Sequence, residues 1–347
     1  FARVAFFTAW QFYCSIYLGI FLVYLLAALT VAIFIVRRPA QWQPWRAQWA
    51  AEHVTSKLAA GAVVLLSALA LAYLLGSYWV VQQKYGLDSQ RSVSYISNVL
   101  PRPASYLVSN GSWLVSWVGR PFDIPTRWEH QMFIGFGAIA LIVAAWRSRA
   151  EVPELTKAML IALALLIAGT LSVAELSLYH LIGWLPGVKA MRAVTRIILI
   201  MLVPLSVLVA LGADAVWRRF GRSARTAVPA LAVAALVVVE PLTGIMRGTP
   251  IAQWHARLDA VKALLPPDLP KDAILLVRSN SRRYADLFPT EVDAMLLGQD
   301  LGYPVLNGYS GFYPPGYQIR PCPRAEERYR DASLRRVVVL DLGNCPR

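Results

Sequence analysis

The segment Leu58–Val81 constrains the fold more than any other part of the chain, because its 24 residues include no charged side chain. A bilayer core about 30 Å thick requires roughly 20 apolar helical residues, so this segment is long enough to cross a membrane alone. The chain as a whole is 57% hydrophobic and 16% charged, whereas about 25% of the residues of a typical soluble domain are charged. The sequence therefore predicts an α-helical integral membrane protein.

Six apolar segments in residues 1–246 have the properties of membrane-spanning helices. We expect these spans at 6–36, 58–81, 131–146, 158–178, 197–217 and 226–245. The first is too long for a simple crossing, and its aromatic start is typical of the membrane interface. The third is short, so it is expected to extend upstream. The fourth contains Glu175, and the sixth contains Glu240 near its outer end.

Lysine and arginine residues gather in alternate loops between these spans, which indicates that those loops face the cytoplasm. The three clusters are Arg37, Arg38, Arg46 and Lys57; Arg147, Arg149 and Lys157; and Arg218, Arg219, Arg222 and Arg225. Residues 1–246 hold 20 of the 34 basic but only 9 of the 20 acidic residues. Loop clusters thus account for most of the net charge of +14, which argues against a nucleic-acid partner.

The same rule places the long loop 82–130, the turn 179–196 and residues 247–347 on the outer side of the membrane. Six spans also place Phe1 outside. Because no translocation signal precedes it, we expect further spans upstream of Phe1.

Residues 247–347 are predicted to form a small extracytoplasmic α/β or α+β domain. Apolar strands are expected at 273–277 and 336–340, with a helix at 289–301 between them. Cys322 and Cys345 lie in this part of the chain, on the side where disulfides persist. We expect them to form a bridge, and the alternative is two unpaired thiols.

Three cations in the outer turn form the most distinctive cluster. Arg192 and Arg196 are four residues apart and would share a helical face, and Lys189 lies three residues before Arg192. Arginine binds phosphate in a bidentate manner, so the cluster indicates a site for an anionic lipid phosphate. Two alternatives remain open, namely a simple anchor to lipid headgroups and an internal ion pair with Glu175.

The other polar candidates near the outer face are Glu129, Glu175, His180 and Glu240. Ionisable groups at membrane depth are costly and often functional, although structural ion pairing is the commoner role. Glu129 could instead cap the N-terminus of the third span. The four histidines are scattered and no cofactor motif is present, so no metal ligands are assigned, while a divalent metal site built from distant residues stays open.

Four pieces of the chain resemble YfhO-like and related bacterial multispan proteins of the GT-C glycosyltransferase class. They are Glu129, Phe133 and Gly135 before a span; Leu185, Pro186 and Gly187 followed by Arg192 and Arg196; Glu240 closing a span; and the segment 307–315. Together they extend over most of the chain from about residue 90 onward.

The resemblance implies a bacterial inner-membrane enzyme that transfers a sugar from a polyprenyl-phosphate donor to a glycan, lipid or protein acceptor on the outer face. Arg192 and Arg196, with Lys189 beside them, would hold the lipid phosphate. The class carries its catalytic carboxylate in its first outer loop, which we expect upstream of Phe1. The tail would cover the site or bind the acceptor, through Asn307, Tyr309, Ser310 and Tyr313.

Two non-enzymatic hypotheses compete with this reading. The chain could be a transporter, flippase or assembly scaffold, although transporters usually show inverted repeats and no convincing repeat is present. It could also be a structural subunit whose tail binds partners in the cell envelope.

Overall fold

The computed structural model describes residues 1–37, 39–84, 93–148, 153–182, 191, 193–220, 224–244, 248, 250–281, 284–309 and 337–342. The chain divides into two compact units. One comprises Phe1–Trp79 and Ser89–Met246, and the other comprises Val80–Asp88 and Arg247–Arg347. Each unit has its own hydrophobic core.

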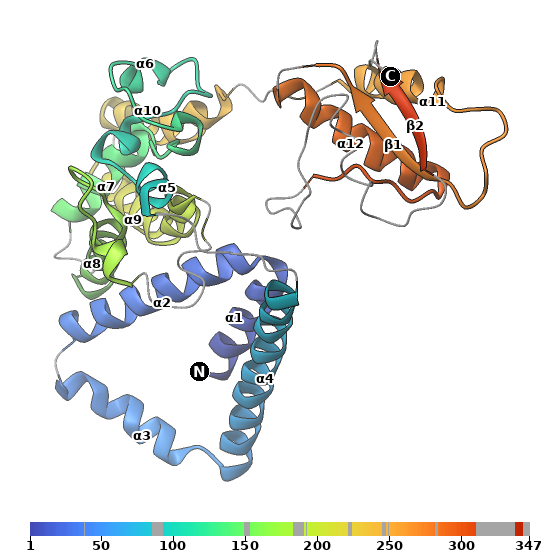
Figure 1. Ribbon diagram of the computed structural model, residues 1–347. Coiled ribbons are helices and arrows are strands. Elements are labelled where there is room, and N and C mark those ends of the chain that lie inside the picture. The colour runs from blue at the N-terminus through green and yellow to red at the C-terminus, as the bar shows by residue number, and fades with distance from the viewer. Residues whose placement is uncertain are drawn as a thin grey trace. The chain divides into compact units, whose positions relative to one another are not determined.

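Helices dominate the described part of residues 1–244 (Figure 1). The α-helices are α1 (Ala2–Cys14), α2 (Ile16–Val36), α3 (Gln43–Ala51), α4 (Val54–Lys84), α5 (Val93–Asn98), α6 (Ser116–Gly119), α7 (Phe136–Arg147), α8 (Pro153–Thr170), α9 (Ile198–Phe220) and α10 (Ala224–Leu242). Short 3-10 helices are η1 (Pro39–Trp42), η2 (Pro103–Leu107), η3 (Arg127–Glu129), η4 (Leu178–Ile182) and η5 (Val194–Ile197).

Three helical segments among the described residues are long and apolar enough to cross a membrane. They are α2, α4 and Val194–Phe220, in which η5 leads directly into α9. Phe136–Arg147 and Leu231–Leu242 are apolar but shorter. The helical, membrane-type character of the chain is therefore found as expected, whereas the number of six spans stays a prediction.

The first expected span is two helices rather than one. Ser15 adopts an extended conformation, with φ −165° and ψ 112°, and separates α1 from α2. Its hydroxyl accepts a hydrogen bond from the backbone N–H of Leu18 at 3.3 Å. Serine at this position is a helix N-cap, because its side chain satisfies an N–H group that lacks a partner within the helix. The uncharged run therefore contains a helix boundary at Ser15, which hydropathy does not reveal.

The third and fourth expected spans have wrong boundaries. Helix α7 begins at Phe136, so the upstream extension of the third span is wrong. Helix α8 ends at Thr170, eight residues before the expected end at 178. Beyond it, Ser172 N–H donates to the carbonyl of Pro101 at 2.7 Å. Hydropathy continues past the end of α8, but the backbone there bonds to another segment instead of continuing the helix.

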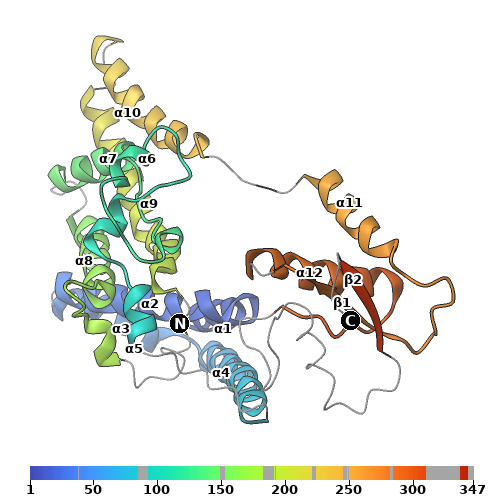
Figure 2. The same cartoon turned by 45° about the horizontal axis from the view of Figure 1, so that its top comes forward.

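The core of the first unit lies between α2, α8 and α9, where α2 packs on α8 and α9 contacts both (Figure 2). Ala28 and Ala32 on α2 are buried, as are Ala158 and Ala162 on α8. Each pair has the four-residue spacing that puts both side chains on one helical face. Small residues let two helix backbones approach closely, which is the usual basis of helix association in membranes.

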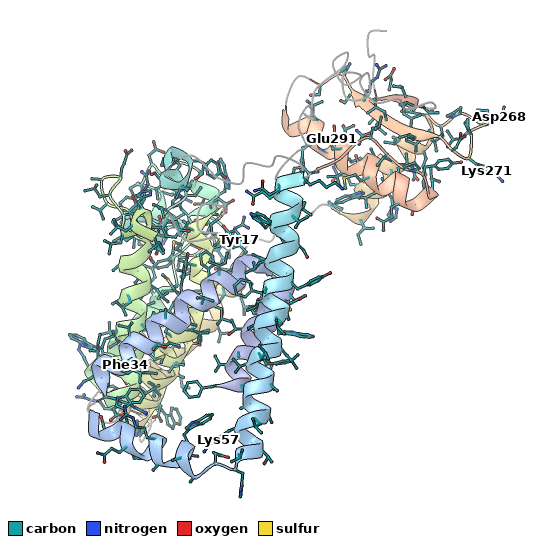
Figure 3. The ribbon with its side chains drawn as sticks, turned by 60° about the horizontal axis from the view of Figure 1, so that its bottom comes forward. Tyr17, Phe34, Lys57, Asp268, Lys271 and Glu291 are labelled. Atoms are coloured by element: carbon teal, nitrogen blue, oxygen red, sulfur yellow. The ribbon has the colours of Figure 1, made fainter. Side chains whose placement is uncertain are left out.

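Helix α4 has few protein neighbours. Only 6% of its most apolar window is buried, and Ser67 is its single buried residue. Figure 3 shows the side chains along its length, with Lys57 near its first turns. The Tyr13 hydroxyl on α1 donates to the carbonyl of Ala70 at 2.9 Å. A helix that is apolar around its whole circumference is suited to hydrocarbon rather than to water.

The second unit contains two parallel strands, β1 (Ile274–Ser279) and β2 (Val337–Leu342), paired from Ile274 with Val337 to Ser279 with Leu342. Its described part also contains α11 (Ile251–Lys262) and α12 (Tyr284–Leu301), and α12 packs against β1. Both expected strands are found, within two residues of their expected ends, and the whole expected helix 289–301 lies within α12. Helix α12 starts five residues earlier, at Tyr284, so Pro289 lies inside the helix and not at its start.

Strand β1 is buried on both faces, because Leu275, Leu276 and Val277 are consecutive and each is at most 2% exposed. Consecutive buried residues are typical of a parallel strand that is covered on both sides. The core of this unit comprises Val261, Leu275, Val277, Ala294, Leu297 and Leu340. Ionic contacts add to it, and the buried Arg278 guanidinium donates to Asp341 on β2 at 2.6 and 2.7 Å.

Candidate functional site

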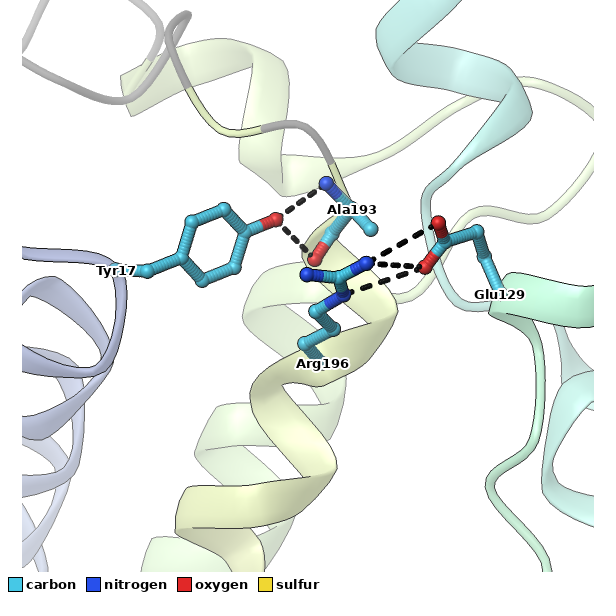
Figure 4. Close-up of polar contacts among 4 residues, drawn as sticks. All are labelled: Tyr17, Glu129, Ala193 and Arg196. Carbon is cyan, nitrogen blue, oxygen red and sulfur yellow. Dashed lines mark hydrogen bonds and ion pairs between the residues drawn. The ribbon is translucent and has the colours of Figure 1, made fainter. Parts of the chain in front are cut away.

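The Arg196 cluster, defined here as Tyr17, Glu129, Ala193 and Arg196, joins three distant parts of the first unit (Figure 4). The Arg196 guanidinium donates from Nε and Nη2 to the Glu129 carboxylate at 3.2–3.3 Å. Its carbon lies 5.7 Å from the centre of the Tyr17 ring, a distance at which a cation interacts favourably with an aromatic face. The Tyr17 hydroxyl donates to the carbonyl of Ala193 at 2.6 Å.

These contacts hold the guanidinium in one orientation and leave part of it accessible. The Arg196 side chain is 46% exposed and that of Glu129 is 14% exposed. Among the described residues, no acceptor contacts Nη1 of Arg196. The ion pair expected as an alternative is present, but its carboxylate belongs to Glu129 and not to Glu175.

Glu175 and His180 lie in the segment after α8. Glu175 is exposed, and its φ of 67° is in the left-handed region. It is therefore not inside a membrane-spanning helix, as the expected fourth span required. His180 is half-buried in η4, and its Nε2 lies 3.5 Å from the Ser97 hydroxyl. Neither residue contacts the Arg196 cluster through a hydrogen bond between described residues.

Lys189 and Arg192 lie outside the described residues. Ala193 is extended, with φ −144° and ψ 100°, and the helical segment starts at Val194. The argument that one continuous helix places Arg192 and Arg196 on the same face is therefore wrong. Of the three expected cations, only Arg196 has a described position.

Glu240 caps the helix that Glu129 was expected to cap. The carboxylate of Glu240, at the end of α10, accepts hydrogen bonds from the backbone N–H groups of Phe136 and Gly137 at 2.9 and 3.1 Å. These groups belong to the first turn of α7, where backbone donors lack partners within the helix. Gly135 precedes them with φ 93°, and a side chain there would collide with the Glu240 carboxylate. The buried Glu240 thus has a structural role.

A buried histidine that the sequence did not single out connects the segment before α7 to the region of α5 and η2. His130 is fully buried, with Nδ1 2.7 Å from the Ser105 hydroxyl and Nε2 3.0 Å from the carbonyl of Asn98. A carbonyl only accepts, so Nε2 carries the proton and Nδ1 accepts from Ser105. Burial lowers the pKa of His130 below its ordinary value of 6.5, with a contribution from Arg102.

A cavity of about 570 Å³ opens between the segment 109–115, the residues before α7 and the end of α10. We call it the Asn110 pocket. Its lining includes Asn110, Trp128, Gln131, Phe133 and Glu240. The volume is in the range of small-molecule sites, about 300 to 1,000 Å³. One local signal could have pointed to this site, namely the dipeptide Asn110–Gly111, which is a turn motif.

Two of the four tail residues expected to contact the acceptor are described. Asn307 is buried, where it accepts from Val277 N–H at 2.7 Å and donates to the Val277 carbonyl and to Glu291. Tyr309 is 41% exposed, and its ring contacts Phe288 edge to face. The role of these residues in acceptor binding stays a prediction.

Several expected features fall outside the described residues, so the structure does not place them. They are Ser310 and Tyr313 of the tail and the disulfide between Cys322 and Cys345. Among the described residues, no group of three or more His, Cys, Asp or Glu side chains is arranged to hold a metal ion.

Comparison of this chain with protein-family models, curated proteins and solved structures finds no match.

Proposed function

We propose that this chain is part of a membrane glycosyltransferase of the GT-C type, which uses a polyprenyl-phosphate-linked sugar at the outer face of the bacterial inner membrane. The Arg196 cluster is the observation that carries the proposal. It offers a guanidinium held by Glu129 and Tyr17, whose Nη1 meets no acceptor within the described part of the chain and whose side chain is 46% exposed. Pre-orientation of this kind favours recognition of a phosphate group.

In the proposed reaction, an acceptor hydroxyl oxygen bonds to the anomeric carbon of the sugar. The bond from that carbon to the phosphate oxygen breaks, and polyprenyl phosphate leaves with the electron pair. The acceptor proton passes to a general base, which the resemblance places in the first outer loop of such enzymes. Arg196 would stabilise the negative charge that develops on the leaving phosphate.

The proposal predicts that the protein distinguishes a polyprenyl phosphate from the corresponding polyprenol. Native mass spectrometry of the full chain in detergent would measure binding of both lipids. Arg196→Gln should weaken phosphate binding about 10-fold or more, since a charge-assisted hydrogen bond contributes about 1.5–3 kcal/mol. Polyprenol binding should not change.

Arg218→Gln is the matched control. Arg218 lies near the other end of α9, is 51% exposed and pairs with Asp214, so its removal should leave phosphate binding unchanged. Equal binding of the phosphate by the wild type and Arg196→Gln would contradict the phosphate role. In native membranes, unchanged sugar transfer by the Arg196 variant would contradict the catalytic role.

A further inference from the structure

The lining of the Asn110 pocket combines apolar side chains with amide groups. The lining comes from the segment before α6, the segment before α7 and the end of α10. Its apolar surface is supplied by Val115, Phe133, Ile134, Val237 and Pro241. Ser109, Asn110 and Gln131 supply polar groups, and Trp128 is part of the lining while 73% exposed. A pocket with a largely apolar lining and a few placed polar groups is the usual form of a small-molecule site.

Protein contacts orient the two amide side chains. Asn110 Oδ1 accepts from Arg127 Nε at 3.0 Å, and Gln131 Oε1 accepts from the backbone N–H of Asn110 at 2.6 Å. Gln131 Nε2 also donates to the Arg127 carbonyl at 3.0 Å. Both amide oxygens are thus engaged, whereas Asn110 Nδ2 and one N–H of Gln131 have no acceptor among the described residues. The lining residues therefore include two oriented amide groups that have neutral donors to offer.

Charge in the pocket disfavours an anionic ligand. Among the described lining residues, Glu240 is the one with a charged side chain, and its carboxylate is already bonded to the first turn of α7. An anion would meet this negative charge, and no described lining residue carries a positive charge to offset it. A neutral ligand with many hydroxyl groups meets no such penalty, because hydroxyl oxygens accept from amide N–H groups.

We propose that the Asn110 pocket binds a neutral sugar ring, carried either by a lipid or by a free glycan. The hydroxyl groups would accept from Asn110 and Gln131, and the C–H face of the ring would cover the exposed indole of Trp128. An aromatic ring of this size offers a large apolar contact surface. The inference deepens the proposed function and rests on it, because that function is the reason to expect a sugar as the ligand. The binding test itself does not require sugar transfer.

The test uses the full chain in lipid nanodiscs prepared without glycolipids or glycoside detergents. Saturation-transfer NMR would measure binding of the methyl glycosides of glucose, galactose, mannose and N-acetylglucosamine. At least one should bind the wild type, and Trp128→Ala should weaken it about 10-fold or more. Trp128→Phe should retain most of the binding, because it keeps an aromatic face. Asn110→Asp keeps the acceptor for Arg127 but removes the amide donors, so it should also weaken binding.

Trp113→Ala is the matched control, since Trp113 is 68% exposed but does not line the pocket. It should bind as the wild type does. Octyl glycosides of the same sugars distinguish the carriers: tighter binding than the methyl glycoside indicates a lipid-linked sugar, and equal binding indicates a free glycan. Circular dichroism would confirm that each variant is folded.

Two results would overturn the inference, namely no binding of any glycoside by the wild type, or equal binding by the wild type and Trp128→Ala. Sugar binding without transfer in native membranes would leave this inference in place and count against the proposed function. If the wild type transfers sugar but Trp128→Ala binds sugar as well as the wild type does, the proposed function stands and this inference is wrong.

Discussion

At the scale of single residues, the contact between Glu240 and the first turn of α7 fixes the position of both helices. Glu240→Ala would leave the N–H groups of Phe136 and Gly137 without their acceptor. Loss of a cap and of buried hydrogen bonds costs about 2 kcal/mol. We therefore expect the midpoint of thermal unfolding of the detergent-solubilised chain to fall by several degrees.

Glu240→Gln provides the comparison for this prediction. Its amide oxygen can still accept one of the two hydrogen bonds, so its unfolding temperature should lie between those of the wild type and Glu240→Ala. If Glu240→Ala unfolds at the wild-type temperature, the capping role is wrong.

His130 gives a prediction about pH. Its pKa is lowered in the folded protein, so below about pH 6.5 the unfolded chain takes up a proton before the folded chain does. Stability should therefore be constant above pH 7 and should fall as the pH drops below 6.5. Thermal unfolding between pH 5 and pH 8 measures this slope.

A variant at an exposed histidine is the control for the pH prediction. His130→Gln should remove part of the slope, whereas His53→Gln should keep it, because His53 is exposed. A slope that is unchanged in His130→Gln would show that other groups cause the acid sensitivity.

The sequence identified some members of the candidate site but not their partners. It singled out Arg196 as a phosphate ligand and Glu129 and Glu240 as polar residues near one membrane face. The partners are distant in sequence. Arg196 and Glu129 are 67 positions apart, and Glu240 accepts a hydrogen bond from Phe136, which lies 104 positions before it. Spacing rules concern neighbours within one helix or strand, so they could not pair these residues. His130 was missed because a lone histidine carries no motif.

At the scale of elements, the close packing of α7 and α9 requires a glycine. A side chain at Gly212 on α9 would collide with the backbone of Leu141 on α7. Gly212→Leu should separate these helices at a cost of at least about 1–3 kcal/mol, which is typical of overpacking. The expected result is a lower unfolding temperature and reduced yield of the purified protein.

Gly61 on α4 is the matched control. An added side chain at Gly61 meets no atom within 4 Å, so Gly61→Leu should be tolerated and should slightly favour the helix. Equal stability of Gly212→Leu and the wild type would refute the close approach of α7 and α9.

Elements were predictable where a local signal exists, although their ends were not. Short runs of Val, Ile and Leu predicted strands at 273–277 and 336–340, which are found at 274–279 and 337–342, and the uncharged run 58–81 lies within α4. The end of α8 at Thr170 was not predictable, because the apolar pattern continues and the hydrogen bond to Pro101 lies far away in sequence. Ser15 could have been noticed as an N-cap, but hydropathy alone does not detect it.

At the scale of the whole molecule, the proposed function depends on which side of the membrane each segment occupies. Helix α4 has 31 residues, which span about 46 Å at 1.5 Å per residue. This exceeds the bilayer core of about 30 Å, so the two ends of α4 can reach opposite surfaces. From the basic residues before α4 we expect its start to face the cytoplasm, and the proposal places the second unit outside.

Single cysteines would test this arrangement in a background of Cys14→Ser, Cys322→Ser and Cys345→Ser. Glu52→Cys lies before α4, and Asp268→Cys lies in the exposed connection between α11 and β1 shown in Figure 3. A membrane-impermeant maleimide should label Asp268→Cys in cells whose inner membrane is intact, and Glu52→Cys only after that membrane is permeabilised. Both should react equally in detergent. Labelling of both positions from the same side would mean that α4 does not separate the two surfaces. A cytoplasmic position 268 would contradict transfer at the outer face, because the second unit could not then contact an external acceptor.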